Sequence, residues 1–147
     1  MPATTAPRSF IMTVFGVVGF LWFAVHAAEY VYARYDGLQS ALPLPDPLGV
    51  AALFEAMPQW AGIALTAAIW LGLLGALLLI VQDRAAVIVL SFTFLASLPV
   101  LVWAGLAFAE GMEVIGSLHI LMFAGAQVAM ALGLWLYART AKRYGIF

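Results

Sequence analysis

Four long apolar runs occupy most of this chain, and each is long enough to cross a lipid bilayer as an α-helix. They comprise residues 10–32, 60–81, 85–108 and 114–137, with 22 to 24 residues in each. A membrane-spanning helix needs about 20 apolar residues, because it rises 1.5 Å per residue through about 30 Å of hydrocarbon. The sequence therefore predicts an all-α membrane protein with four transmembrane helices.

The charged residues separate by sign if the chain crosses the membrane four times. Five of the six Lys and Arg residues then lie at one face, and six of the seven Asp and Glu residues lie at or toward the other. The basic five are Arg8, Arg84, Arg139, Lys142 and Arg143, and the acidic six are Glu29, Asp36, Asp46, Glu55, Glu110 and Glu113. Because basic flanks stay in the cytoplasm, we expect cytoplasmic N- and C-termini in a bacterial inner membrane.

Composition limits the chain to one membrane domain and excludes several functions. Of the 147 residues, 66% are hydrophobic and 9% are charged, so a short tail (1–9) precedes a single four-helix domain (10–147). A net charge of −1 without a run of like charge argues against a nucleic-acid partner. The chain has no cysteine, which excludes disulfides and thiolate sites, and no nucleophile or phosphate-loop motif. We therefore do not expect an enzyme.

Connection lengths predict how the helices are joined. The connections at 82–84 and 109–113 are short, so each joins two antiparallel neighbours, and an up-down-up-down bundle follows. The first outer loop, residues 36–57, is the longest. Its prolines (Pro43, Pro45 and Pro47) exclude helix at its centre. Residues 48–57 after them predict a short helix lying in the membrane interface.

Small residues recur every four positions on two of the predicted helices. The second carries Ala64, Ala68, Gly72 and Ala76, and the fourth carries Gly125, Ala129 and Gly133. In lipid, such stripes let two helix backbones approach closely and gain dispersion contacts. The stripes either hold the bundle together or join subunits, and internal packing is the simpler interpretation.

Two histidines fall at similar depth in the predicted outer leaflet. His26 lies in the outer half of the first helix, and His119 in the outer half of the fourth, which runs the opposite way. Glu29 follows His26 by three residues and shares its helical face. Glu55, Glu110 and Glu113 stand at the ends of neighbouring helices on the same side.

Three interpretations of these residues remain open. Ionisable groups within spans are costly and normally face a bundle interior or an aqueous cavity. They could make structural or interfacial hydrogen bonds, line a polar cavity for an ion or solute, or hold a cofactor such as haem, a pigment or a metal through His26 and His119. Gln127, at the middle of the fourth helix, fits an interhelical hydrogen bond or a transport site.

Two segments resemble a loose family of small, largely uncharacterised bacterial four-helix membrane proteins, some labelled "sugar transporter". These segments are LFEAMPQW (residues 53–60), continuing into the small-residue second helix, and the C-terminal WLYARTAKRYGIF. The resemblance covers residues 10–147 and is structural in kind: an interfacial turn, a small-residue helix and a basic anchor. It carries no functional residue to this chain.

The function that we expect is binding or passage of a small solute or ion through an outward-facing polar cavity. The alternative is an accessory subunit that packs against a larger membrane complex, with a haem or pigment bound by His26 or His119. The lipid bilayer is a partner in both cases. Because four short helices enclose little volume, passage of a solute would require a homo-oligomer.

Overall fold

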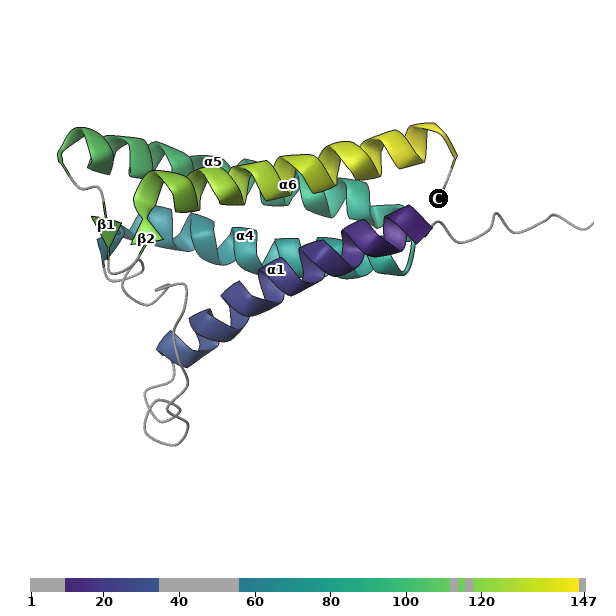
Figure 1. Ribbon diagram of the computed structural model, residues 1–147, viewed down its shortest axis with the longest axis horizontal. Helices are drawn as coiled ribbons and strands as arrows, with labels where there is room; N and C mark the ends of the chain where they lie inside the picture. The colour runs from purple at the N-terminus through teal and green to yellow at the C-terminus, as the bar shows by residue number, and fades with distance from the viewer. Residues whose placement is uncertain (1–9, 35–55, 112–113, 116–117, 146–147) are drawn as a thin grey trace, which may run out of the picture.

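The computed structural model describes residues 10–34, 56–111, 114–115 and 118–145. Within these residues the chain forms four long helices and two short strands (Figure 1). The helices are α1 (Phe10–Arg34), α4 (Gln59–Ile80), α5 (Ala85–Ala109) and α6 (Ile120–Arg143), and the strands are β1 (Val114–Ile115) and β2 (Leu118–His119). All four helices are long and apolar enough to cross a membrane, as the sequence predicted.

The boundary of the fourth helix differs from the prediction, whereas the other three agree within two residues. The predicted run began at Val114, but α6 begins at Ile120 and continues to Arg143. Residues 114–115 instead pair with 118–119 as an antiparallel ladder, with Val114 opposite His119. Backbone pairing between strands competes with helix, and β-branched Val and Ile favour it. His119 therefore precedes α6 and does not lie within it.

Glycines set the contact between α1 and α4. A Cβ at Gly16 would collide with Ile80, and one at Gly72 would collide with the ring of Phe23. The start of α1 thus lies against the end of α4, so the two helices run in opposite directions. Toward its C-terminal end α1 diverges from α4 (Figure 1). This close approach occupies only the half of the bundle that holds the chain termini.

Helix α5 packs against α4 on one side and α6 on the other. A Cβ at Gly75 of α4 would meet Leu90 of α5, and the rings of Phe94 and Trp135 stack with centroids 5.8 Å apart. The α4–α5 turn is fixed by Asp83, whose carboxylate accepts a hydrogen bond from the Ala85 N–H at 2.9 Å. Contact between α1 and α6 is much less extensive than these contacts.

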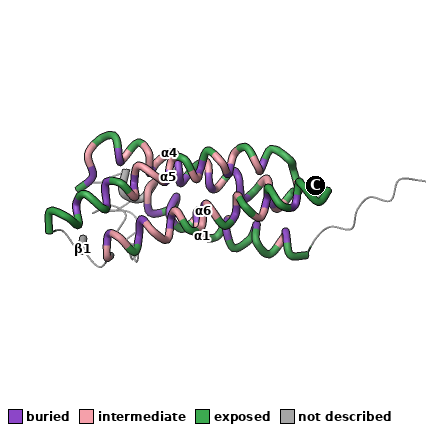
Figure 2. Tube along the Cα trace, turned by 90° about the horizontal axis from the view of Figure 1, so that it is seen from above, coloured by how far each residue is buried: buried purple, intermediate pink, exposed green. Residues whose placement is uncertain are grey.

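The core consists of two hydrophobic clusters, one toward each end of the bundle. Buried residues repeat along the inner side of each helix (Figure 2). One cluster includes Ile69, Trp103 and Phe123, and the other includes Phe23 and Leu90. Buried polar side chains lie between the clusters in α5 and α6, namely Thr93, Ser97 and Gln127. A polar level therefore separates the two apolar halves.

The two small-residue stripes have different environments. In α4, Ala68, Gly72 and Ala76 are buried, which confirms internal packing for that stripe. In α6, Gly133 is exposed, and a Cβ added to Gly125 or Gly133 would meet no atom within 4 Å. Internal packing is thus wrong for α6, because its stripe faces outward within the described residues. Contact with another chain remains the open interpretation.

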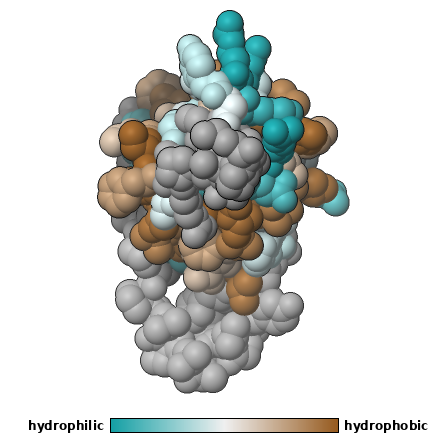
Figure 3. Space-filling view, turned by 90° about the vertical axis from the view of Figure 1, so that its right-hand side faces the viewer, coloured by the Kyte–Doolittle hydropathy of each residue, from teal (hydrophilic) through white to brown (hydrophobic). Residues whose placement is uncertain are grey.

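Exposed basic side chains gather at one end of the bundle. Arg139, Lys142 and Arg143 are exposed in the last turns of α6, and Arg84 is exposed in the α4–α5 turn. The start of α1 lies at the same end (Figure 1). Figure 3 looks onto this end and shows hydrophilic residues collected over one side of it. The predicted interfacial helix, residues 48–57, lies almost entirely outside the described residues.

Alanine substitutions should have different effects on stability in the buried α4 stripe and the outward-facing α6 stripe. Gly72→Ala should lower the free energy of unfolding by about 1–3 kcal/mol, because the added methyl group overlaps the Phe23 ring. Gly133→Ala should be neutral or stabilise by up to about 1 kcal/mol, because it meets open space and improves helix propensity. Unfolding in detergent measures both, and equal losses would contradict this packing.

Candidate functional site

Polar and aromatic side chains meet where α1 approaches α6. Trp22 and His26 are one turn apart on α1, and Phe123 and Gln127 are one turn apart on α6. The indole N–H of Trp22 donates to the Gln127 side-chain oxygen over 3.4 Å. The His26 ring lies 5.0 Å from the Trp22 ring and 5.7 Å from the Phe123 ring, between centroids. This contact is the polar centre of the α1–α6 seam.

One hydrogen bond fixes the tautomer of His26. Its Nδ1 lies 2.6 Å from the carbonyl oxygen of Trp22, which can only accept, so Nδ1 carries the proton. In the neutral ring Nε2 then holds the lone pair, which is the orientation that metal-binding histidines use. The ring is only 2% exposed, however, and is in contact with both Trp22 and Phe123. A haem at this ring would need more open space around His26 than the structure leaves.

His119 makes a different contact. Its ring packs at 6.1 Å from the ring of Phe108, at the end of α5. Its Nδ1 is buried and has no hydrogen-bond partner in the part of the chain that the structure describes. The rings of the two histidines thus contact different residues, His26 in the α1–α6 seam and His119 beside α5. A ligand shared by the two remains a prediction.

The predicted carboxylates fall into three situations. Glu29 is 8% exposed, one turn from His26 on α1. Glu110 is exposed at the end of α5. Glu55 and Glu113 lie outside the described residues. Among the residues that are described, no three His, Asp or Glu side chains gather closely enough to hold a metal ion.

Gln127 is the predicted site residue with the most distinctive environment. It is 1% exposed, at the polar level between the two core clusters. Its oxygen accepts from Trp22, while its Nε2 has no partner among the described residues. A buried donor of this kind costs about 1–3 kcal/mol if it stays unsatisfied. The amide nitrogen therefore has two N–H donors available for further acceptors.

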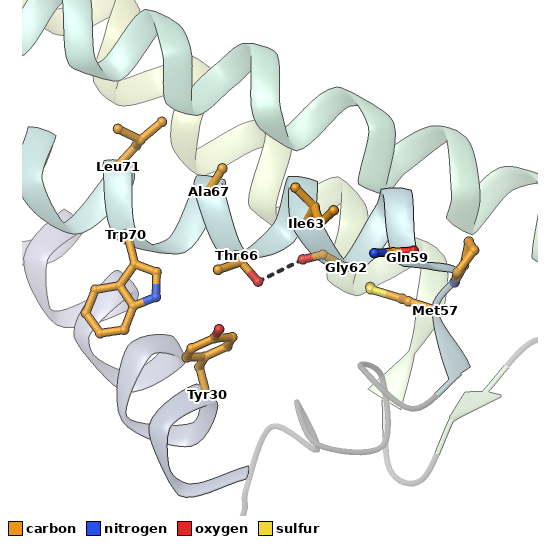
Figure 4. Close-up of a pocket in the computed structure, with 10 residues that line it drawn as sticks. Tyr30, Met57, Gln59, Gly62, Ile63, Thr66, Ala67, Trp70 and Leu71 are labelled. Atoms are coloured by element: carbon orange, nitrogen blue, oxygen red, sulfur yellow. Dashed lines mark hydrogen bonds between the residues drawn. The ribbon is translucent and has the colours of Figure 1, made fainter. Parts of the chain in front are cut away.

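A pocket of about 590 Å³ opens between α1 and α4, where α1 diverges from its neighbour (Figure 4). The volume lies within the range of small-molecule sites. The polar and aromatic residues that define its walls are Tyr30 of α1 and Gln59, Thr66 and Trp70 of α4. Trp70 is 41% exposed, so the pocket opens at the surface of the bundle and is not sealed.

The side chains of this α1–α4 pocket converge from both helices. Figure 4 shows Tyr30 pointing from α1 toward Trp70 and Thr66 of α4. The rings of Tyr30 and Trp70 meet edge to face, with centroids 5.9 Å apart and an interplanar angle of 87°. The Thr66 hydroxyl donates to the Gly62 carbonyl at 2.8 Å, so its remaining lone pairs can only accept. The pocket thus combines aromatic walls with a few uncharged polar groups.

A second, apolar groove of about 430 Å³ lies between α1 and α6. Phe15, Val18 and Trp22 form its α1 side, and Ala129 and Gly133 belong to its α6 side. The small residues hollow this surface because they carry little or no side chain. The groove follows the outward-facing α6 stripe.

None of the seven predicted site residues is among the described residues that line the α1–α4 pocket. Sequence reasoning looked for ionisable groups, and the pocket is built from uncharged ones. Thr66 is a polar residue within a predicted span, and its depth is close to that of Tyr30. The similar depth of Thr66 and Tyr30 was the signal in the sequence that could have pointed to the pocket. The rest depends on where α1 leaves α4, which residue patterns do not reveal.

No family model, curated protein or solved structure matches this chain. The resemblance to small bacterial membrane proteins stays a prediction, and the function must be argued from the site itself.

A double-mutant cycle between Trp22→Phe and Gln127→Leu should give a coupling free energy of about 0.6 kcal/mol, typical of interhelical hydrogen bonds in membranes. Gln127→Leu alone should be nearly neutral in stability, because it also removes the buried Nε2 donor. Detergent unfolding of the four proteins measures the cycle. A coupling above about 2 kcal/mol would mean that the amide belongs to a larger polar network.

Proposed function

We propose that this chain is an integral membrane protein that binds a small solute in the pocket between α1 and α4. The observation that carries the proposal is the 590 Å³ pocket itself, with Tyr30 and Trp70 as aromatic walls and Gln59 and Thr66 as polar groups. Apolar walls with few polar groups are the usual composition of small-molecule sites. Passage of the solute across the membrane is a further step, and it requires an oligomer.

The membrane orientation that we propose follows from the positions of the basic residues. The four helices cross as an up-down-up-down bundle in a bacterial inner membrane, with the basic end of α6 and the α4–α5 turn in the cytoplasm. The exposed Arg84, Arg139, Lys142 and Arg143 support this orientation through the positive-inside rule. Gln59, the first residue of α4, then lies at the outer face. The pocket therefore opens in the outer half of the membrane.

Cysteine labelling tests whether the pocket opens outward. Gln59→Cys, at the outer end of the pocket in a chain that has no cysteine of its own, should react with a membrane-impermeant thiol reagent added to intact spheroplasts. Arg84→Cys is the matched control, because Arg84 is likewise exposed but lies at the opposite end of the bundle, and it should react only after the membrane is opened. The reverse pattern would contradict the outward orientation.

Native mass spectrometry tests binding. Wild-type protein extracted in mild detergent should carry a small molecule that Thr66→Trp lacks, because the indole projects into the middle of the pocket and blocks it. Equal adducts on both proteins, or no adduct on either, would argue against this site. The control for folding is equal thermal stability of the two proteins.

The alternative function, an accessory subunit of a larger membrane complex, is favoured by one observation. The α6 stripe of Gly125, Ala129 and Gly133 faces outward beside the apolar α1–α6 groove, and both glycines border open space. A helix of another chain could approach there as closely as Phe23 approaches Gly72. Burial of His26 under Trp22 and Phe123 gives no comparable support to a haem.

A larger side chain on the α6 stripe tests the accessory-subunit function. Gly133→Leu should leave the thermal stability of the isolated chain unchanged and abolish a complex or homo-oligomer that forms through this stripe. Cross-linking in membranes, followed by size analysis, measures the loss. An unchanged assembly would place any partner on another face.

A further inference from the structure

We infer that the ligand of the α1–α4 pocket is an uncharged, ring-containing amphiphile that enters from the lipid with its polar end outward. This inference rests on the proposed binding function and names the class of ligand. It combines the charge of the pocket walls, the order of polar and apolar groups along α4 and the opening of the pocket at the bundle surface.

The walls argue against a charged ligand. No Lys, Arg, His, Asp or Glu is present among the described residues that line the pocket. A charge moved into a membrane site without a counter-charge loses its hydration and gains no compensating partner. The start of α4 also lies at the pocket, with Pro58 as its N-cap residue and no side-chain cap, and the partial positive charge of a helix N-terminus disfavours a cation.

The order of groups along α4 argues for an amphiphile. Gln59 begins the helix, Thr66 lies two turns further in, and Trp70 lies one turn beyond Thr66. From Gln59 to Trp70 the pocket wall extends about 16 Å, and both polar side chains that α4 contributes, Gln59 and Thr66, precede Trp70. A ligand with one polar end and an apolar body would match this order when its polar end lies at the membrane surface.

The aromatic walls argue for a ring. Tyr30 and Trp70 stand at 87° to each other and so form two adjoining sides of one corner. A flat ring in such a corner can stack on one of them and present its edge to the other, which are the two favourable aromatic geometries. The Thr66 oxygen, whose proton is already donated to Gly62, can accept a hydrogen bond from a ring hydroxyl.

The pocket opens where a membrane-soluble molecule would arrive. Ile63 is 63% exposed and Trp70 is 41% exposed, and both line the pocket on the outer side of α4. Residues this exposed on a spanning helix face hydrocarbon unless another chain covers them. A ligand can then move from the bilayer into the pocket without first crossing water, which suits a neutral amphiphile and not a water-soluble ion.

Binding of two probes that share a decyl chain tests the inference. 4-Decylphenol carries a neutral ring with one hydroxyl group, and decyltriphenylphosphonium carries a cationic head. With protein in lipid nanodiscs and empty nanodiscs subtracted, radiolabelled 4-decylphenol should bind saturably. Decyltriphenylphosphonium should not displace it. Equal or tighter binding of the cation would overturn the neutral class, and so would the absence of saturable 4-decylphenol binding.

Variants show where the probe binds, and they distinguish failure of this inference from failure of the proposed function. Trp70→Leu and Thr66→Trp should weaken 4-decylphenol binding roughly tenfold or more, because one removes an aromatic wall and the other places an indole in the middle of the pocket. Trp60→Leu, at an exposed tryptophan outside the described lining, should retain the wild-type affinity. If the cation binds and Thr66→Trp abolishes that binding, the pocket stands and only the ligand class fails. If neither probe binds saturably, the inference fails, and native mass spectrometry of the wild type and Thr66→Trp then decides whether the pocket binds a ligand of another class.

Discussion

Close approach of α1 to α4 at two glycines determines much of the remaining structure. Within a bilayer, helices gain little by burying apolar surface against each other, so contact between backbones supplies the attraction. Gly16 and Gly72 permit that contact in the basic half of the bundle, where Ile80 and Phe23 fill the space that a Cβ would need. In the opposite half, by contrast, Tyr30 faces Trp70, and two large rings cannot pack as closely as a ring on a glycine. The pocket is the space that this change of spacing leaves.

The polar groups within the spans show how a chain keeps hydrogen bonds satisfied without water. Thr66, Thr93 and Ser97 donate their hydroxyl protons to carbonyls three or four residues earlier in the same helix. These bonds need no partner helix and do not align one helix with another. Gln127 is different, because its oxygen accepts from Trp22 of α1. It therefore links two helices that make few contacts with each other, while leaving its own nitrogen available.

Sequence patterns predicted the helices well and the pocket not at all, for physical reasons. Hydrophobic length alone specifies a span, so α1, α4 and α5 were predicted within two residues. The start of α6 was misplaced because Val-Ile-Gly-Ser-Leu-His also suits a hairpin, with Gly-Ser between Val-Ile and Leu-His, and hydrophobicity alone does not distinguish a hairpin from the first turns of a helix. Burial of His26, Glu29 and Gln127 agrees with the cost of ionisable and polar groups in lipid. A pocket made by divergence of two helices depends on their crossing geometry, which single-residue patterns do not encode.

The division of the core into two clusters gives the bundle two mechanically distinct halves. The cluster toward the termini includes Phe23 against Gly72 and is tied to the short α4–α5 turn, so it acts as a rigid base. The other cluster lies beside the diverging end of α1, which makes few contacts with α6. Tilting of α1 about its glycine contacts would change the width of this end without disturbing the base. The bundle is thus built with a fixed hinge at its basic end and an adjustable opening at the other.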